Sequence, residues 1–396
     1  MIPRRKAQII KGELFLCLKS ILDKDGNLSV YIDKWQDRFA RFIGAKHAIA
    51  VSSGRQAMKL ILQSLELNAD DEVIVPAYTL KELTQIIVSL GLRAVPADID
   101  PDTFNISPES IIAKINKRTK VILATHIFGA PCQIDEILDL AKKKSIFVVE
   151  DCAHSLGSRF KGRQTGSFGD AAFFSLETIK PVNTYGGGMI VTNNDKIADK
   201  IRNTLGGIRV NAGIPFKKMI LARLEDYFLS TPLFYPGLYL LASAYWHKKI
   251  YSFYRKLQGA ANVKGGFCGF QALIGMEKLN TLEQRVSQRN IQALLLRSLL
   301  NEKIKVQRIL EGANSNYYFF VFLLPGDIWR ARKFLLMHGV DAGIEAEIAD
   351  DCGKYLGSAD CHSAAEIFRH SIQIPLHEGM SEANIRYLAE TLNRLC

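Results

Sequence analysis

Short apolar runs alternate with stretches of helical period between residues 37 and 215 of this chain. The apolar runs predict strands at 48–51, 72–75, 94–97, 121–125, 146–150, 171–175 and 189–192. Between them, apolar residues spaced three and four apart predict helices at 56–67, 80–90, 107–115 and 134–144. This β–α rhythm predicts an α/β fold, in which a mainly parallel seven-stranded sheet lies between helices.

The pattern changes from about residue 285 onward. A long helix is predicted at 281–300, followed by a strand at 317–324 and helices at 328–338 and 382–395. This order is typical of a smaller C-terminal α+β domain. We therefore expect five parts: an N-terminal segment (1–36), a large domain (37–215), an insertion (216–261), a return segment (262–284) and a small domain (285–396).

The insertion contains an uncharged stretch, residues 227–246, that is long enough to suggest a membrane span. A single span is excluded because the chain must rejoin its domain afterwards, and Pro232 and Pro236 would break a continuous helix. Two interpretations remain. The stretch is a buried or dimer-interface excursion, or it is a hairpin that dips into a bilayer surface, which the flanking basic residues and the Tyr and Trp residues at its edges suit.

The composition limits the setting and the partners. The chain has 396 residues, of which 48% are hydrophobic, and a formal net charge of +11, which favours an anionic partner such as a phosphorylated substrate, a nucleotide or an acidic membrane surface. No basic tract interleaved with aromatics indicates nucleic-acid binding. The seven cysteines are scattered without a CxxC pair, so we expect neither a metal site nor disulfides, and a cytoplasmic location. We expect no signal peptide.

Lys180 is the most informative residue. It stands five residues after Ser175, between an apolar strand and a glycine run. A lysine that forms a Schiff base and a serine that meets a phosphate suit pyridoxal phosphate (PLP). Upstream, Asp151 ends another apolar strand, where a buried carboxylate needs a cation such as a protonated pyridine nitrogen. Asp151 alone could be a turn residue, but together the three residues predict a PLP site.

A second group of residues suits the phosphate. Ser53, Gly54 and Arg55 follow a predicted strand and open a predicted helix, whose N-terminal N–H groups and dipole attract anions. An ordinary serine N-cap explains this motif when it is taken alone. In combination with Ser175 the phosphate interpretation is favoured.

Two histidines follow predicted strands. His154, three residues after Asp151, is a candidate for the face of the cofactor ring, although a lone histidine is more often structural. For His126 a packing role and a catalytic role are equally supported. Ligand groups gather at the carboxyl ends of parallel strands, and His126, Asp151 and Ser175 all follow or end such strands.

Taken together, these motifs resemble those of the sugar aminotransferases of the DegT/StrS family, which are fold-type-I PLP enzymes. The resemblance runs from Trp35 to Asn393. Besides the residues above, the matching stretches are Asp71 to Thr79, Asp98 to Thr103, His126 to Gly129, Glu150 to His154 and Pro375 to Met380.

The resemblance implies a role for each candidate residue. Lys180 would be the Schiff-base lysine, Asp151 the partner of the pyridine nitrogen, and His154 the residue beside the ring. Gly54, Arg55 and Ser175 would hold the phosphate, with Ser53 beside them.

The resemblance also implies a homodimer, with residues 262–284 at the interface and an asparagine of the second subunit reaching the phosphate. Asn262 is the candidate, although Lys264 fits the family's spacing better.

The expected function is that of a PLP-dependent aminotransferase. It would pass an amino group from glutamate to a nucleotide-linked keto sugar, in the biosynthesis of cell-surface polysaccharide or a related glycoconjugate. Two alternatives stay open. One is a PLP enzyme of the same fold that acts on a lipid-linked or non-nucleotide substrate at a membrane surface, and the other is a non-catalytic regulatory or scaffold protein.

Overall fold

The computed structural model describes residues 2–4, 6–22, 28–206, 212–229, 231 and 266–396. Asn262, Lys264 and residues 232–246 of the uncharged stretch lie outside the described residues. None of the helices in the described part of the chain combines the length and the apolar character that a membrane crossing requires.

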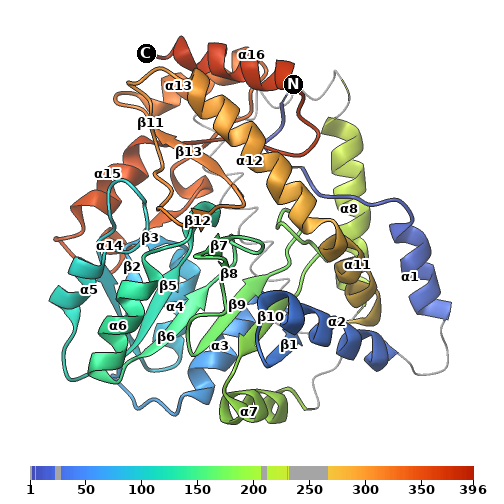
Figure 1. The fold of residues 1–396 in the computed structure, drawn as a ribbon, viewed down its shortest axis with the longest axis vertical. Coiled ribbons are helices and arrows are strands. Elements are labelled where there is room, and N and C mark those ends of the chain that lie inside the picture. The colour runs from blue at the N-terminus through green and yellow to red at the C-terminus, as the bar shows by residue number, and fades with distance from the viewer. Residues whose placement is uncertain (1, 5, 23–27, 207–211, 230, 232–265) are drawn as a thin grey trace.

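A seven-stranded sheet forms the centre of the large domain (Figure 1). Its strands, in spatial order, are β1 (His47–Val51), β10 (Gly188–Thr192), β9 (Ala171–Ser175), β6 (Phe147–Asp151), β5 (Thr119–Thr125), β2 (Glu72–Pro76) and β4 (Arg93–Ala97). The neighbours from β9 to β4 pair in parallel, whereas β10 runs antiparallel to both β9 and β1. The prediction of a mainly parallel seven-stranded sheet is confirmed.

Helices cover both faces of this sheet. One layer consists of α3 (Gly54–Ser64), α4 (Lys81–Ser89) and α7 (Asp195–Leu205), and the other of α5 (Pro108–Lys114), α6 (Ile134–Lys144), α2 (Leu28–Ile43) and α11 (Gly269–Asn280). The side chains of successive strand residues pack alternately against the two helix layers. Val73 and Val75 pack in the core under α3 and α4, while Ile74 packs in the core with α5 and α6.

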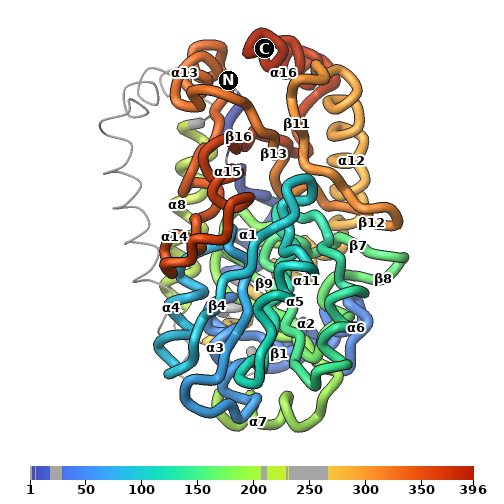
Figure 2. Tube along the Cα trace, turned by 90° about the vertical axis from the view of Figure 1, so that its left-hand side faces the viewer, coloured from blue at the N-terminus to red at the C-terminus, as the bar shows by residue number. Residues whose placement is uncertain are grey.

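The C-terminal part forms a second core at one end of the molecule (Figures 1 and 2). Its helices are α12 (Leu282–Leu299), α13 (Ile328–Met337), α14 (Cys352–Tyr355), α15 (His362–His370) and α16 (Glu382–Asn393). Its sheet has the order β11 (Lys305–Val306), β13 (Phe320–Leu323), β16 (Ser371–Ile374) and β14 (Gly343–Ile344). The predicted strand 317–324 is wrong at its start, because Tyr317 has a positive φ of 45° that interrupts extended backbone.

Short strands join the two parts at their edges. One pair is β3 (Tyr78–Thr79) with β15 (Asp350–Asp351), and a three-stranded sheet combines β12 (Ala313–Asn314), β7 (Arg159–Phe160) and β8 (Arg163–Gln164). The structure also has two 3-10 turns, η1 (Ile127–Gly129) and η2 (Glu345–Glu347). These pairings hold the small domain against the large one.

The N-terminal arm, of which residues 2–4 and 6–12 are described, crosses between the two parts (Figure 1). Ile2 pairs with Val340 of the small domain, and the Arg4 guanidinium forms an ion pair with Glu347 (2.6 Å). The arm then leads to α1 (Glu13–Leu22), which lies beside α11 and α8 (Gly213–Leu229). The five-part division expected from the sequence stays a prediction.

Candidate active site

The site begins at the N-terminus of α3, which meets the ends of two strands. Ser53 caps this helix, and its hydroxyl oxygen accepts a hydrogen bond from the backbone N–H of Gln56 (3.1 Å). A Cβ atom at Gly54 would lie 3.1 Å from the Cβ of Ser175, the last residue of β9. At Gly188, which begins β10, a Cβ would lie 2.6 Å from the Gly54 amide nitrogen. The N-terminus of α3 and Ser175 therefore lie side by side, an arrangement that suits a phosphate-binding site.

Lys180 lies in the segment between β9 and β10. Its backbone N–H donates to the Glu177 carbonyl (2.9 Å), and its Nζ lies 4.6 Å from the centre of the Tyr318 ring. Burial lowers the pKa of Lys180 to about 8, although the carboxylates of Asp151 and Glu177 favour the charged form. The neutral amine, which is the nucleophilic and basic form, is therefore accessible close to neutral pH.

Asp151 ends β6 at the same edge of the sheet and is only 5% exposed. One carboxylate oxygen accepts a hydrogen bond from the Ala153 N–H (3.0 Å). Burial raises the pKa of this carboxyl group, partly offset by the Ala153 N–H and the charge of Lys180. None of the described cationic side chains forms an ion pair with Asp151. A buried carboxylate of this kind suits a cationic ring nitrogen.

His154 lies in a stack of aromatic rings near Lys180. Its ring is 4.5 Å from that of Tyr318, at an angle of 26°, and 6.2 Å from that of Phe128, at 15°. Burial, and then the charge of Lys180, lowers the pKa of His154 well below its ordinary value, so the ring is neutral. Its Nδ1 accepts a hydrogen bond from the Phe128 N–H (3.3 Å), which leaves the proton on Nε2.

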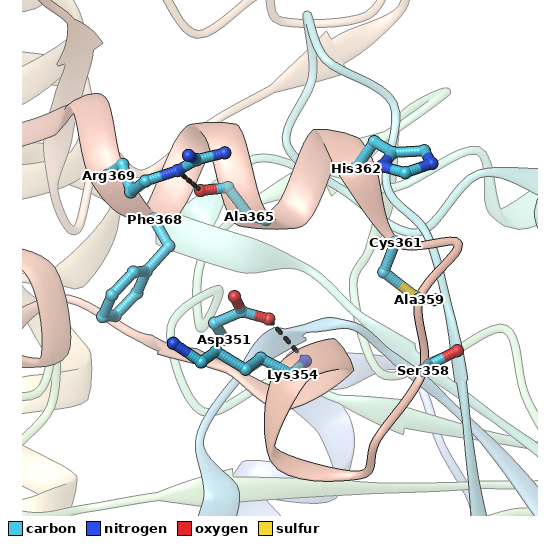
Figure 3. Close-up of a pocket in the computed structure, with 9 residues that line it drawn as sticks. All are labelled: Asp351, Lys354, Ser358, Ala359, Cys361, His362, Ala365, Phe368 and Arg369. Atoms are coloured by element: carbon cyan, nitrogen blue, oxygen red, sulfur yellow. Dashed lines mark hydrogen bonds between the residues drawn. The ribbon is translucent and has the colours of Figure 1, made fainter.

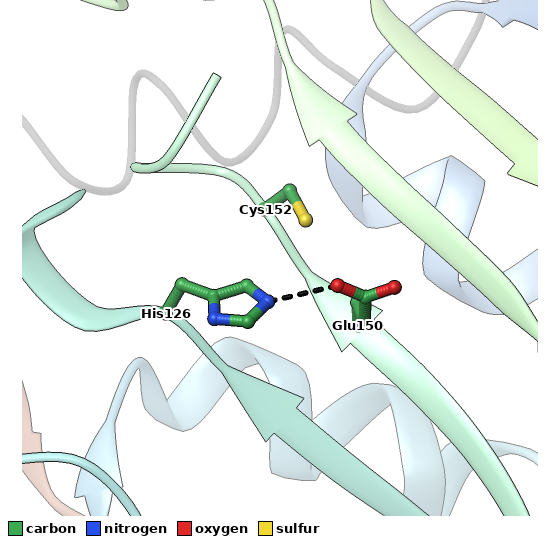
Figure 4. Close-up of side chains that lie close together, drawn as sticks. All are labelled: His126, Glu150 and Cys152. Atoms are coloured by element: carbon green, nitrogen blue, oxygen red, sulfur yellow. Dashed lines mark hydrogen bonds and ion pairs between the residues drawn. The ribbon is translucent and has the colours of Figure 1, made fainter. Parts of the chain in front are cut away.

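Three buried side chains beside the site could be mistaken for a metal centre (Figure 4). The ligand atoms of His126, Glu150 and Cys152 lie within 4.8 Å of one another, and His126 Nε2 is 3.0 Å from a Glu150 oxygen. The Glu150 oxygens also accept three backbone N–H groups of residues 166–169, each at 2.7 Å. His126 Nδ1 accepts the Cys132 N–H (3.1 Å). Because these bonds already use the carboxylate and imidazole atoms, the cluster holds β5, β6 and the following loop together.

A cavity of about 60 Å³ adjoins Lys180. Its walls come from segments far apart in the sequence: Lys6 and Gln8 of the N-terminal arm, Arg289 of α12, and His377 after β16. No local pattern marked the arm or α12 as part of the site. Their contribution arises only because the small domain and the arm fold over the edge of the sheet.

A second pocket lies away from these residues, between α14 and α15 (Figure 3). Its polar lining is partly engaged, since Arg369 Nε donates to the Ala365 carbonyl (3.0 Å) and an Asp351 oxygen accepts the Lys354 N–H (2.9 Å). None of the candidate PLP-site residues lines it. The candidate PLP site therefore lies at the edge of the large sheet and not in this second pocket.

Comparison with known proteins identifies the family. The profile of the DegT/DnrJ/EryC1/StrS aminotransferase family matches residues 18–393. The chain belongs to this aminotransferase family.

Named members of the DegT/DnrJ/EryC1/StrS family are similar over different lengths. The GDP-perosamine synthase of Vibrio cholerae is 39% identical over 170 residues, which is 43% of this chain and 46% of the relative, so this match spans less than half of either protein. The GDP-perosamine synthase of Escherichia coli O157:H7 is 28% identical over 384 residues, or 95% of this chain and 93% of the relative. The PLP form of a Streptococcus pneumoniae protein has the same fold, with a TM-score of 0.79, 21% identity and coverage of 100% and 98%.

The structure brings most of the candidate residues predicted from the sequence into one region. Ser53, Gly54 and Ser175 meet at one corner, Arg55 is the second residue of α3, and Asp151 and His154 both lie close enough to Lys180 for its charge to affect their pKa values. Tyr318 was missed, because its run of aromatic residues was predicted to be a strand. Asn262 lies outside the described residues.

Proposed function

We propose that this protein is a PLP-dependent aminotransferase that passes an amino group from glutamate to a nucleotide-linked keto sugar. The observation that supports it most is the combination of Lys180, whose pKa burial lowers to about 8, with the buried carboxylate of Asp151. Two relatives named GDP-perosamine synthase support a nucleotide-linked acceptor. Synthesis of a cell-surface polysaccharide or related glycoconjugate is the proposed pathway.

The residues present fit the cofactor. Because Gly54 and Gly188 have no side chains, the N-terminus of α3 lies close to Ser175, and a phosphate at this corner would have Ser53, Arg55 and Ser175 as further contacts. Asp151, which forms no ion pair with a described residue, would receive the ring nitrogen.

The roles of the side chains follow from their protonation states. PLP, when bound, supplies an electron sink for breaking bonds at the carbon that carries the amino group. Lys180 Nζ holds or releases a proton near neutral pH, so it can move a proton between substrate and cofactor. His154, neutral and fixed by the Phe128 N–H, can donate a hydrogen bond from Nε2–H without adding positive charge.

The proposed assembly is a homodimer in which a residue of the second subunit, Asn262 or Lys264, reaches the phosphate. Exposed apolar residues of α1 and α8, namely Phe15 (67%), Leu221 (53%) and Leu224 (50%), support burial of this side of the chain in an assembly. Sedimentation equilibrium tests this directly, and a monomer at micromolar concentration would contradict it.

The proposal is tested by the absorbance spectrum of purified protein with PLP, before and after glutamate is added. The wild type should show a band near the visible edge that glutamate bleaches, and Lys180→Ala should show no bleaching. Lys200→Ala is the matched control, because Lys200 is 42% exposed and pairs with Glu66 on the surface. Absence of the band in the wild type, or bleaching in Lys180→Ala, would refute the assignment. Mass spectrometry of reactions with nucleotide-linked keto sugars then identifies the acceptor.

A further inference from the structure

Three residues that line the cavity beside Lys180 carry buried polar atoms without hydrogen-bond partners among the described residues. Both ring nitrogens of His377, Oε1 of Gln8 and Nε of Arg289 are buried, and none makes a hydrogen bond to a described residue. Leaving a buried polar group unpaired is costly in a folded protein, so such groups mark either a defect or a ligand site. Three of them at one cavity, next to the candidate Schiff-base lysine, indicate a ligand site.

The neighbouring charged groups do not satisfy these atoms. Glu378 is held by the guanidinium groups of Arg289 (3.1 Å) and Arg285 (3.5 Å). Arg285 is further occupied by the carbonyl oxygens of Pro181 (2.7 Å) and Lys278 (2.9 Å). These bonds fix the wall of the cavity, and Nε of Arg289 takes no part in them.

The chemistry of the three groups restricts the ligand. Burial lowers the pKa of His377 to about 4, helped by the charges of Lys6 and Arg289 against those of Glu378 and Asp226, so its ring is neutral. A neutral imidazole offers one donor and one acceptor, Gln8 Oε1 is an acceptor, and Arg289 Nε–H is a donor. A carboxylate or phosphate would leave both acceptors unpaired. A hydroxyl group donates and accepts, and several hydroxyls on one ring match all three.

We propose that Gln8, Arg289 and His377 form the subsite that binds the sugar hydroxyls of the acceptor, so that the N-terminal arm helps to select the substrate. This rests on the function proposed above. The ligand reaches the subsite by displacing the side chain of Lys6, which is exposed. A Cβ atom on Gly379 would lie 3.4 Å from Lys6 Nζ and 3.6 Å from His377 Nδ1, so this ammonium group borders the histidine.

The test measures what the sugar adds to binding. Calorimetric titration of PLP-saturated, full-length protein compares GDP-mannose with GDP, UDP-glucose with UDP, and TDP-glucose with TDP. These sugars carry no keto group, so they bind without turnover. In the wild type at least one sugar nucleotide should bind more tightly than its own nucleotide. This gain, the ratio of the two affinities, should fall about tenfold in His377→Phe and in Gln8→Leu. His377→Gln, which still donates and accepts, should keep much of the gain.

The matched control is His370→Phe. His370 also has a buried ring nitrogen without a partner, but it lies at the end of α15 and does not line this cavity. This variant should keep the full gain, and every variant should bind the bare nucleotide as the wild type does. No gain in the wild type for any pair, an unchanged gain in both cavity variants, or an equal loss for the bare nucleotide would overturn the subsite.

The outcome is separable from that of the proposed function. Bleaching by glutamate in the wild type tests the proposed function, whereas the gain in affinity from the sugar, compared between the wild type and the two cavity variants, tests the subsite. Bleaching in the wild type together with an unchanged gain in the variants would reject the subsite alone. Absence of bleaching in the wild type would reject the aminotransferase proposal itself.

Discussion

A buried ion pair ties the N-terminal part of the chain to the segment that carries Lys180, and its removal should destabilise the protein. Lys278 Nζ and Glu13 Oε1 are 2.7 Å apart, and both side chains are 0% exposed. Lys278 also donates to Asn183 Oδ1 (2.8 Å), and Glu13 accepts the Tyr185 hydroxyl (2.7 Å). Asn183 and Tyr185 follow Lys180 closely in sequence, so the pair anchors the active-site segment to α1 and α11.

The perturbation is Lys278→Met, which keeps the length of the side chain but leaves Glu13 buried without its main counter-charge. Breaking a buried pair by removing one partner costs about 3–5 kcal/mol. The half-exposed Arg223, 3.1 Å from Glu13, and the Tyr185 hydroxyl remain, which places the expected loss near the lower end, about 3 kcal/mol. With about 2.1 cal/mol/K of unfolding entropy per residue, this corresponds to a Tm about 4 °C lower.

The assay is urea unfolding and thermal melting of Lys278→Met, Glu13→Gln and the double variant. A double-mutant cycle should give a coupling of about 1–3 kcal/mol, because the second change removes a group that the first left unpaired. Lys161→Met is the control, since Lys161 pairs with Asp135 on the surface, where both side chains are exposed, and should cost less than about 1 kcal/mol. Single variants as mild as Lys161→Met, or a cycle without coupling, would refute the reasoning.

Three further predictions follow from the site and its surroundings. Because burial lowers the pKa of Lys180 to about 8, the rate at which PLP-free protein captures added PLP should rise through pH 8 as the neutral amine forms; a rate that inflects only near the ordinary lysine value of about 10.4 would contradict this. Gly188→Ala should weaken PLP binding and cost about 1–3 kcal/mol of stability, because the new Cβ would lie 2.6 Å from the Gly54 nitrogen and 2.8 Å from the Phe174 carbonyl; wild-type melting and PLP titration curves would contradict it. If residues 227–246 dock on a bilayer, the protein should co-sediment with phosphatidylserine vesicles, and salt should weaken this binding. Protein that stays in the supernatant would contradict bilayer docking and favour the interpretation as a buried or dimer-interface excursion.

The local sequence was sufficient to predict the large sheet and the centre of the candidate site. Each of the seven strands is a short apolar run in the sequence. The carboxyl ends of the parallel strands lie at one edge of the sheet. Asp151 and Ser175 therefore came together from sequence position alone, with Lys180 nearby. The Ser53 cap was equally local, since a strand followed by Ser-Gly at a helix start needs no distant contact.

Other features depend on segments that are far apart in the chain. The pairing of β1 with β10 joins residue 47 to residue 192, and no local period encodes the antiparallel direction of β10. The positive φ of Tyr317 interrupts extended backbone at the start of a predicted strand, so Tyr318 lies outside the observed strand and its ring stacks on that of His154.

The sequence by itself determined the fold class, and it predicted the cofactor chemistry and the candidate residues at the strand ends, because those follow from local periodicity and residue type. Only the tertiary structure decided that Gln8, Arg289 and His377 share a cavity, and that Glu13 and Lys278 form a buried pair. The physical reason is that these side chains become buried, and that polar atoms of Gln8, Arg289 and His377 lose their hydrogen-bond partners, only after the arm and the small domain pack over the sheet. Gln8, Arg289 and His377 would all be hydrated in the unfolded chain. Folding buries polar atoms of these residues without hydrogen-bond partners, which is the basis of the proposed subsite.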